Sequence, residues 1–382
     1  MKILFAAHEG DLNGSSKSLI NLIDVLNQSH KIYVLTSYQS GKFVEELQKH
    51  NCTVWYAPYY RWVKTKPESA LRWLYMRLKW YCYEQWINQK SAKKIAKLVQ
   101  AEQIDLVHSN TRVINMGGLL RRYAGVKHIW HFREFGEEDF SMYPVTSKKT
   151  HYAQISAMAD GVIVISDAVG NKFKPLLQNE IPMVRIYNGV DASNLLEKQP
   201  YAPERISFLI SGRVSPTKGQ REVVQAAYLL LQQGFTNFKI YMAGTMSQGF
   251  SLFDGKTEDT KEYVELLGQI SDMPALRRKM DVELVCSKAE AFGRVTIEAM
   301  MCSMPVIGSA AGGTVELITE GETGYLYEQG NPAALAERMK IFLENPKQVS
   351  ILGREAFRRS KEYFLIERCA GEIEAFYQKL LQ

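Results

Sequence analysis

The sequence predicts an α/β protein with two doubly wound domains, each built around a mostly parallel sheet. Three observations support this fold class: short apolar runs rich in β-formers, helical patterns between those runs, and a turn-rich seam near the middle of the chain. Continuous apolar runs of this length fit strands covered on both faces, and the helices between them imply parallel βαβ units. The 382 residues suffice for two domains with ordinary cores.

One series of expected strands precedes the seam and a second series follows it. The first series comprises residues 2–7, 31–36, 53–57, 104–109, 127–132, 161–166 and 183–187. The second comprises residues 206–211, 238–243, 282–286, 306–308 and 324–327. The final stretch predicts an amphipathic helix whose apolar stripe consists of Cys369, Ile373, Phe376 and Leu380.

The seam lies at residues 188–205, which carry turn formers and two prolines between strands. We therefore expect one domain at residues 1–190, a second at 191–362 and a terminal helical segment at 363–382. Open parallel sheets bind ligands beyond the carboxyl ends of their strands, so functional residues are expected in the loops there.

Composition narrows the class of protein further. Apolar residues make up 46% of the chain and charged residues 23%, as in globular rather than disordered proteins. The five cysteines are scattered without Cys-x-x-Cys spacing, which favours a reducing cytosol over a disulfide framework or a zinc site. The N-terminal apolar run is too short for a signal peptide, and no run reaches membrane-spanning length. We therefore expect a cytoplasmic protein.

Basic residues and tryptophans concentrate in the segment Arg61–Lys97, which holds ten basic residues, two acidic ones and four of the six tryptophans. The residues at helical spacing within it are Trp73, Met76, Trp80, Tyr83 and Ile87. Two interpretations stay open: a long helix packing this stripe on its own domain, or a helix lying on an anionic membrane surface. Nucleic acid is not an expected partner, because no nucleic-acid-binding signature accompanies the segment.

Two loops at strand ends carry phosphate-binding features. Residues 13–18 open a helix after the first strand, where Gly14 and the backbone of Ser15 could approach a phosphate; the alternative is an ordinary helix cap by Ser15 or Ser16. Residues 211–219 place Arg213 and Lys218 in a turn after the first strand of the second domain. These cations could clamp a diphosphate, or belong to a solvated turn.

Two acidic residues and one histidine are the other candidates for functional residues. Glu290 is expected in the loop before a helix that starts near Arg294, and Glu298 within that helix. A carboxylate among apolar neighbours needs a partner, and ligand hydroxyls would supply one for Glu298. His131 falls near the carboxyl end of an expected strand, just before Arg133, and is either structural or functional.

Together these motifs resemble the retaining glycosyltransferases of family 4, which have the GT-B fold. The matching residues are Gly212-Arg213, Lys218-Gly219, Ser287, the E-x7-E pair Glu290 and Glu298, Phe292-Gly293, Pro305-Val306 and Gly312-Gly313. The chain departs from the family pattern at Asn13, where a glycine pair is usual, at Ala291, and at Met301 and Ser303, where alanine and glycine are usual.

The resemblance implies two Rossmann-like domains facing each other across a cleft, with a nucleotide-diphosphate sugar on the C-terminal domain and the acceptor on the N-terminal one. The final helix would cross back to the N-terminal domain. The implied roles are Arg213 and Lys218 on the diphosphate, Glu290 with Phe292 and Gly293 at the transferred sugar, Glu298 on the ribose, Gly14 and Ser15 at the phosphates, and His131 and Arg133 at the acceptor and reacting centre.

The implied reaction is a retaining, metal-independent sugar transfer without cofactor to a lipid-linked or glycan acceptor, in surface polysaccharide or glycolipid synthesis. Such an enzyme could sit peripherally on the inner face of the membrane. Two alternatives stay open: a soluble transferase acting on a protein or small molecule, and a catalytically inactive sugar-binding partner of a related transferase.

Overall fold

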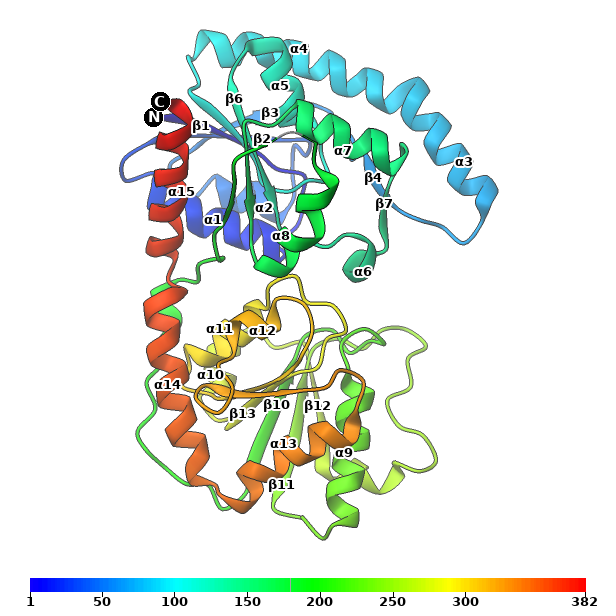
Figure 1. The fold of residues 1–382 in the computed structure, drawn as a ribbon, viewed down its shortest axis with the longest axis vertical. Helices are drawn as coiled ribbons and strands as arrows, with labels where there is room; N and C mark the ends of the chain where they lie inside the picture. Colours follow the sequence, from blue (N-terminus) through cyan, green and yellow to red (C-terminus); the bar gives the residue numbers. More distant parts are fainter. Residues whose placement is uncertain (179) are drawn as a thin grey trace. The chain divides into compact units, whose positions relative to one another are not determined.

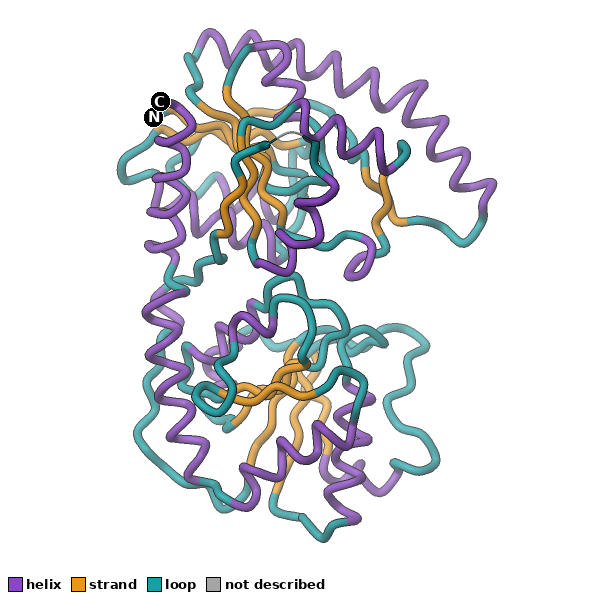
Figure 2. The backbone as a smooth tube through the Cα atoms, in the orientation of Figure 1, coloured by secondary structure: helices purple, strands orange, loops and turns teal. Residues whose placement is uncertain are grey.

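The chain forms two compact units, each with a central parallel sheet. The computed structural model describes residues 1–178 and 180–382. Unit 1 comprises Met1–Gly189 and Ile366–Gln382, and unit 2 comprises Val190–Leu365 (Figures 1 and 2). The terminal helix therefore belongs to unit 1.

The sheet of unit 1 has β1 between β2 and β5, and all its neighbouring strands run parallel. Its order is β3 (Thr53–Tyr56), β2 (Lys31–Thr36), β1 (Lys2–Ala6), β5 (Leu106–Ser109), β6 (Lys127–Phe132), β8 (Gly161–Val164) and β9 (Met183–Arg185). After β1 the chain adds β2 and β3 on one side of that strand, and it then adds β5 and β6 on the other side. Ligands of open α/β sheets bind where the strand order reverses in this way, so the carboxyl ends of β1, β5 and β6 are a suitable place for a ligand.

The helices of unit 1 cover both faces of this sheet (Figure 2). They are α1 (Gly14–Leu26), α2 (Lys42–Leu47), α3 (Ala70–Lys79), α4 (Gln85–Ala101), α5 (Met116–Ala124), α6 (Glu137–Phe140), α7 (Lys148–Ala157), α8 (Asp167–Phe173) and α15 (Ile366–Leu381). Helix α15 packs Cys369, Ile373 and Phe376 into the core formed with α1 and β1, which confirms the expected apolar stripe.

A π-helical turn, η1 (Trp80–Glu84), joins α3 to α4. The stripe expected from Trp73 to Ile87 holds up to Trp80, which is buried, but Tyr83 is exposed. A π turn contains more residues than an α turn and so rotates the following side chains around the helix axis. The expected stripe is therefore interrupted at Tyr83, whereas Ile87 beyond it is half-buried.

The sheet of unit 2 is parallel in the same way, with β10 between β11 and β13. Its order is β12 (Val264–Gly268), β11 (Phe238–Ala243), β10 (Ile206–Ser211), β13 (Val282–Val285), β14 (Val306–Ser309) and β15 (Gly324–Tyr327). The helices are α9 (Gln220–Gln232), α10 (Met273–Arg277), α11 (Arg294–Met300), α12 (Thr314–Leu317), α13 (Pro332–Glu344) and α14 (Lys347–Tyr363).

Every expected strand is present within one or two residues of its expected bounds. The sequence analysis missed β12 and the antiparallel pair β4 (Val63–Thr65) and β7 (Met142–Pro144). Strands of three residues that contain lysine or proline give no continuous apolar run to detect. No helix in the described part of the chain combines the length and apolar character that crossing a bilayer requires.

Candidate functional site

Three loops of unit 2 meet at the carboxyl edge of neighbouring strands. They follow β10, β13 and β14, and they carry Arg213 and Lys218, then Glu290, then Gly312 and Gly313. The backbone N–H of Gly313 donates to the carbonyl of Glu290 at 2.7 Å, which ties the second loop to the third. The sheet thus brings together residues that lie up to a hundred positions apart.

Lys218 and Glu290 form an ion pair across two of these loops, with Nζ 3.0 Å from Oε2. Both side chains are partly exposed, so a ligand can reach them. Arg213 is exposed in the same turn. Gln220 at the start of α9 holds this turn, because its amide accepts from the N–H of Ser215 at 3.2 Å and donates to the carbonyl of Arg213 at 3.1 Å.

Gly219 lets the same turn approach the end of β13. A Cβ at this position would lie 2.2 Å from the carbonyl oxygen of Cys286, and the φ of 79° falls in the left-handed region. A larger residue would push the turn that carries Lys218 away from the loop that carries Glu290.

Glu298 already has protein partners. Its Oε2 accepts from Nη1 of Arg277 at 2.9 Å, and its Oε1 accepts from Nη2 of Arg294 at 3.2 Å. From the sequence, ligand hydroxyls were expected to offset the cost of desolvating this carboxylate. In the structure, two guanidinium groups offset that cost. The carboxylate is nonetheless partly exposed, and its two oxygens offer about four lone-pair positions. It can therefore accept further hydrogen bonds from a ligand.

Arg277 links Glu298 to a second, fully buried carboxylate. Its Nε lies 3.3 Å from Oε2 of Glu283 on β13. Burial alone would lower the pKa of Arg277, but the carboxylates of Glu283 and Glu298 hold it above its ordinary value. Burial raises the pKa of Glu283, and Arg277 opposes that effect. The Glu283–Arg277–Glu298–Arg294 chain thus fixes the position of Glu298.

Phe292 and Gly293 lie at the junction between the Glu290 loop and α11. Phe292 is buried, and Gly293 caps α11 with a φ of 107°. The helix begins at Arg294, as expected. The expected positions of Glu290 before the helix and Glu298 within it are confirmed.

The unusual Ser303 has a structural explanation. Its φ is 52°, in the region that favours glycine, which is the usual residue at this position in the family that the sequence resembles. The serine hydroxyl donates to the carbonyl of Leu196 at 3.0 Å and accepts from the N–H of Lys198 at 3.1 Å. These bonds tie the segment that enters unit 2 to the end of α11.

We expect Gly312→Ala to lower the turnover of the reaction that the resemblance implies, sugar transfer, by more than about tenfold. The added Cβ would lie 2.3 Å from the carbonyl oxygen of Glu290, so the loop that positions this acid must move. Gly321→Ala is the matched control, because Gly321 has a similar φ of 74° but open space around its Cβ. Strain alone costs about 1–2 kcal/mol at both sites. Equal turnover in the two variants would show that the contact with Glu290 does not matter.

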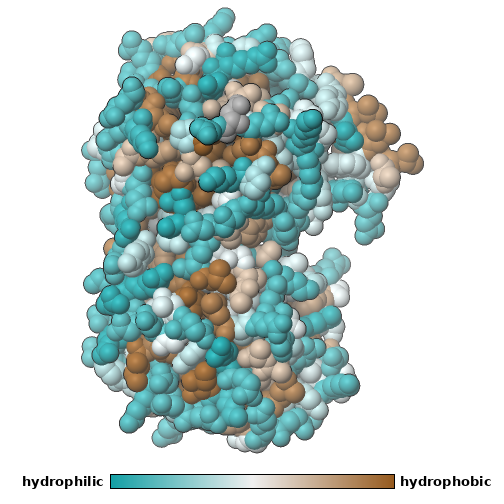
Figure 3. All heavy atoms as spheres, viewed as in Figure 1, coloured by the Kyte–Doolittle hydropathy of each residue, from teal (hydrophilic) through white to brown (hydrophobic). Residues whose placement is uncertain are grey.

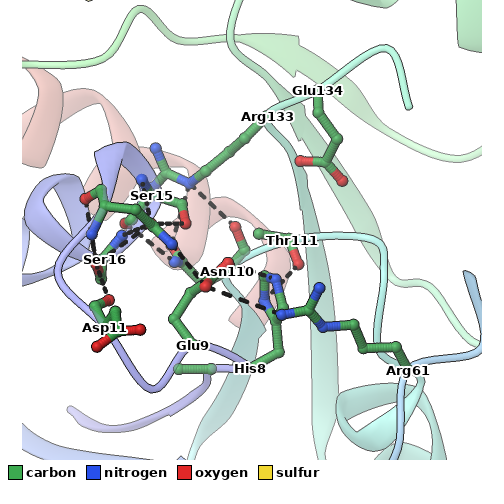
Figure 4. Close-up of polar contacts among 12 residues, drawn as sticks. His8, Glu9, Asp11, Ser15, Ser16, Arg61, Asn110, Thr111, Arg133 and Glu134 are labelled. Carbon is green, nitrogen blue, oxygen red and sulfur yellow. Dashed lines mark hydrogen bonds and ion pairs between the residues drawn. The ribbon is translucent and has the colours of Figure 1, made fainter. Parts of the chain in front are cut away.

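Unit 1 has a polar cluster at the carboxyl edge of β1, β5 and β6 that the sequence analysis largely missed (Figure 4). His8 lies between Glu9, whose Oε1 is 2.6 Å from its Nε2, and the hydroxyl of Thr111 at 3.1 Å. Arg61 lies 3.9 Å from the other oxygen of Glu9. The signal available was that His8 and Glu9 directly follow a strand, the rule that singled out Arg213.

Arg133 belongs to this cluster and is held in place. Its Nε donates to the backbone and side-chain oxygens of Asn110 at 3.0 Å, and its Nη1 donates to the side chain of Asn188. Beside it, burial raises the pKa of Glu134 to about 7. The expected acceptor role of Arg133 stays a prediction.

The helix start at Gly14 is capped differently from the expected alternatives. The cap is Asn13, whose Oδ1 accepts from the N–H groups of Ser15 and Ser16 at 3.1 and 3.3 Å. In return, the N–H of Asn13 donates to the hydroxyl oxygen of Ser16 at 2.7 Å, so Asn13 and neither serine is the cap residue. A phosphate would compete with Asn13 for these groups, and the roles of Gly14 and Ser15 stay predictions.

His131 lies one residue before the end of β6 and is almost fully buried. Its Nδ1 is 3.1 Å from Nε2 of His108, whose Nδ1 contacts the hydroxyl of Tyr377 on α15. Burial lowers the pKa of both histidines well below its ordinary value, so both are neutral. This chain of contacts joins the terminal helix to the sheet. A role for His131 at the reacting centre stays a prediction.

Each unit thus carries a polar cluster at the carboxyl ends of parallel strands, which is where open α/β sheets bind ligands. Residues 192–359 match the family described as glycosyl transferases group 1, and residues 12–194 match glycosyltransferase family 4. The chain therefore belongs to the group 1, or family 4, glycosyltransferases.

Individual proteins agree with this assignment. An uncharacterized glycosyltransferase of Methanocaldococcus jannaschii is 28% identical over 296 residues, which cover 76% of this chain and 80% of that protein. The capsular polysaccharide biosynthesis glycosyltransferase CapM of Staphylococcus aureus is 26% identical over 200 residues, about half of each chain. The structure of Anabaena HepE in complex with UDP has a TM-score of 0.78 and 21% identity, over 99% of this chain and 100% of that one. The fold is GT-B.

Proposed function

We propose that the protein is a retaining glycosyltransferase that moves a sugar from a nucleotide-diphosphate sugar to an acceptor hydroxyl without a metal ion. The observation that carries this proposal is the Lys218–Glu290 pair, 3.0 Å apart and open to solvent beside Arg213. It places cations for a diphosphate next to a carboxylate for sugar hydroxyls, at the strand ends where such sheets bind ligands.

In this proposal Lys218 changes partner when the donor binds. The phosphate oxygens take its ammonium group, and the Glu290 carboxylate is released to accept hydrogen bonds from the transferred sugar, with Phe292 and Gly293 beside it. Arg213 contributes the second positive charge. As the bond between the sugar and the diphosphate breaks, the two cations stabilise the charge that develops on the leaving group.

Glu298 is proposed to bind the ribose hydroxyls. Arg277 and Arg294 fix its orientation, so little side-chain entropy is lost when the ligand binds. The acceptor hydroxyl attacks from the face that the diphosphate leaves, so the sugar keeps its configuration and the protein supplies no nucleophile.

The proposed acceptor is a lipid-linked molecule or a glycan in surface polysaccharide or glycolipid synthesis. The capsular function in the name of the Staphylococcus aureus relative supports this class. Unit 1 would hold the acceptor, with Arg133 and His131 as the predicted contacts. We place the enzyme in the cytoplasm at the inner face of a membrane; the five cysteines, all free thiols, favour a reducing compartment.

A thermal-shift screen of nucleoside diphosphates and their sugars, with and without EDTA, tests the proposal. HepE has been solved with UDP and with UDP-glucose, so uridine compounds come first. At 100 times its Kd, the correct ligand adds about 2.7 kcal/mol to the free energy of unfolding of the unit that binds it. EDTA should leave this shift and the turnover unchanged, and NMR of the product should show the donor's anomeric configuration. Binding without turnover on any acceptor would favour the inactive partner.

A further inference from the structure

Helix α3 has apolar side chains on two opposite faces. One face turns toward unit 1: Trp80 at its end is buried, and Trp73 and Met76 are half-buried. The opposite face is formed by Leu71, Leu74, Tyr75 and Leu78, here called the outer face. Their exposed fractions are 80%, 52%, 63% and 54%. The inner face is enough to pack the helix, so packing within unit 1 does not account for the outer face.

The outer face forms one continuous surface, because its residues are spaced at i, i+3, i+4 and i+7. Figure 3 shows apolar side chains gathered on the end of α3 that extends from the rest of its unit in Figure 1. The exposed aromatic residues Tyr81, Tyr83 and Trp86 continue from it along the same long helix. Contiguous exposed apolar surface of this kind marks an interaction site.

Exposed basic residues lie beside this surface and make its surroundings positively charged. Arg72 and Lys79 lie beside the outer face on α3, and further along the helix the exposed lysines are Lys90, Lys93, Lys94 and Lys97. Within α3, η1 and α4 the one acid is Glu84, which is buried and pairs with Lys64 at 2.6 Å and with Lys79 at 3.6 Å. The solvent side of this helix is therefore basic throughout.

The helix is held firmly enough to present this surface. Ser69 caps it by accepting from the N–H of Arg72 at 3.3 Å, and Nε of Arg77 donates to the carbonyl of Val145 at 2.8 Å. Arg77 therefore acts as a tether and is not available to a partner in the way that Arg72 is.

We infer that the outer face of α3 docks on an anionic lipid bilayer, with its leucines and tyrosine at the level of the headgroups. An anionic surface complements the flanking cations, and tyrosine and tryptophan favour the membrane interface. A second copy of the chain would bring two rows of cations together, which opposes self-association. The choice of a bilayer also draws on the proposed lipid-linked acceptor, but its test needs neither donor nor acceptor.

The test is co-sedimentation of the full chain with phosphatidylcholine vesicles that contain 0 or about 30% phosphatidylglycerol. The wild type should bind the anionic vesicles, and bind less as salt is raised. Replacing Leu71, Leu74, Tyr75 and Leu78 with serine should reduce the partition coefficient by more than about tenfold, since each apolar side chain removed weakens interfacial binding. The single change Arg72→Gln should reduce it by about fivefold.

The matched control replaces Ile351 and Leu266, two residues of unit 2 exposed to a similar extent, with serine, and should not change binding. Circular dichroism and the donor thermal shift check that the quadruple variant is folded and still binds nucleotide. Wild-type binding that equals that of the quadruple variant, or no binding at all, would overturn the inference. Self-association that disappears in the quadruple variant would assign the face to a second copy instead. Either result leaves the donor screen, and so the proposed function, standing.

Discussion

Replacing Lys218 with methionine is expected to lower the rate of sugar transfer by about 10²–10³-fold. In the proposed reaction its ammonium group stabilises the charge that appears on the departing diphosphate, and removing one such group typically costs this much. Methionine keeps the length of the side chain and removes the charge. Because Lys218 and Glu290 are both partly exposed, the stability of unit 2 should change by less than about 1 kcal/mol. The measurement is kcat/KM with the donor identified by the thermal-shift screen.

Lys279→Met is the control, since Lys279 is an exposed lysine of unit 2 outside the three loops. Arg213→Gln should lower the rate in the same way, and the double variant should lose less than the product of the two single effects if both cations hold one diphosphate. A Lys218→Met enzyme that retains turnover within threefold of the wild type would remove Lys218 from the mechanism.

The strand pattern was predictable because the strands of a doubly wound sheet are buried on both faces. Runs such as 206–211 and 238–243 are mostly apolar, and both strands have the expected bounds. The short β4 and β7 pair lies outside the two large sheets, so its residues carry no such pattern. The other missed strand, β12, lies at the edge of the sheet of unit 2, and most of its residues are exposed, so it carries no continuous apolar run either.

The candidate site likewise has a part that could be predicted from the sequence and a part that could not. Loops that follow strands could be placed from the sequence, so the approach of Lys218 to Glu290 was within reach. The pairing of Glu298 with Arg277 was not, because Arg277 lies on the separate short helix α10 and pairs only through the tertiary fold. The pairing with Arg294 was within reach, because the two residues are four positions apart on α11. A buried acid needs a partner, but the sequence around Glu298 does not distinguish a ligand hydroxyl from a distant arginine.

Replacing Arg277 with methionine is expected to destabilise unit 2 by about 3–5 kcal/mol. Glu283 is fully buried, and the change would leave its carboxylate without the guanidinium that compensates its desolvation. Glu298 would suffer less, because it keeps Arg294 and is partly exposed. All six tryptophans precede residue 189, so tryptophan fluorescence reports on unit 1 alone. Hydrogen exchange of β10 and β13 peptides in urea should show the loss in unit 2, while the fluorescence transition stays in place.

The neighbouring Arg278→Met is the matched control, because Arg278 is exposed, and it should change stability by less than about 0.5 kcal/mol. The defect should also depend on pH with a definite sign. Burial already raises the pKa of Glu283 in the folded state, and loss of Arg277 raises it further. The folded variant therefore binds a proton more tightly than the unfolded chain, so its stability relative to wild type recovers as pH falls toward 4.5 and declines as pH rises. Adding Glu283→Gln should restore much of the lost stability at neutral pH. A defect that is constant from pH 5 to 8 would mean that packing around Arg277, and not the buried charge, holds this part of unit 2 together.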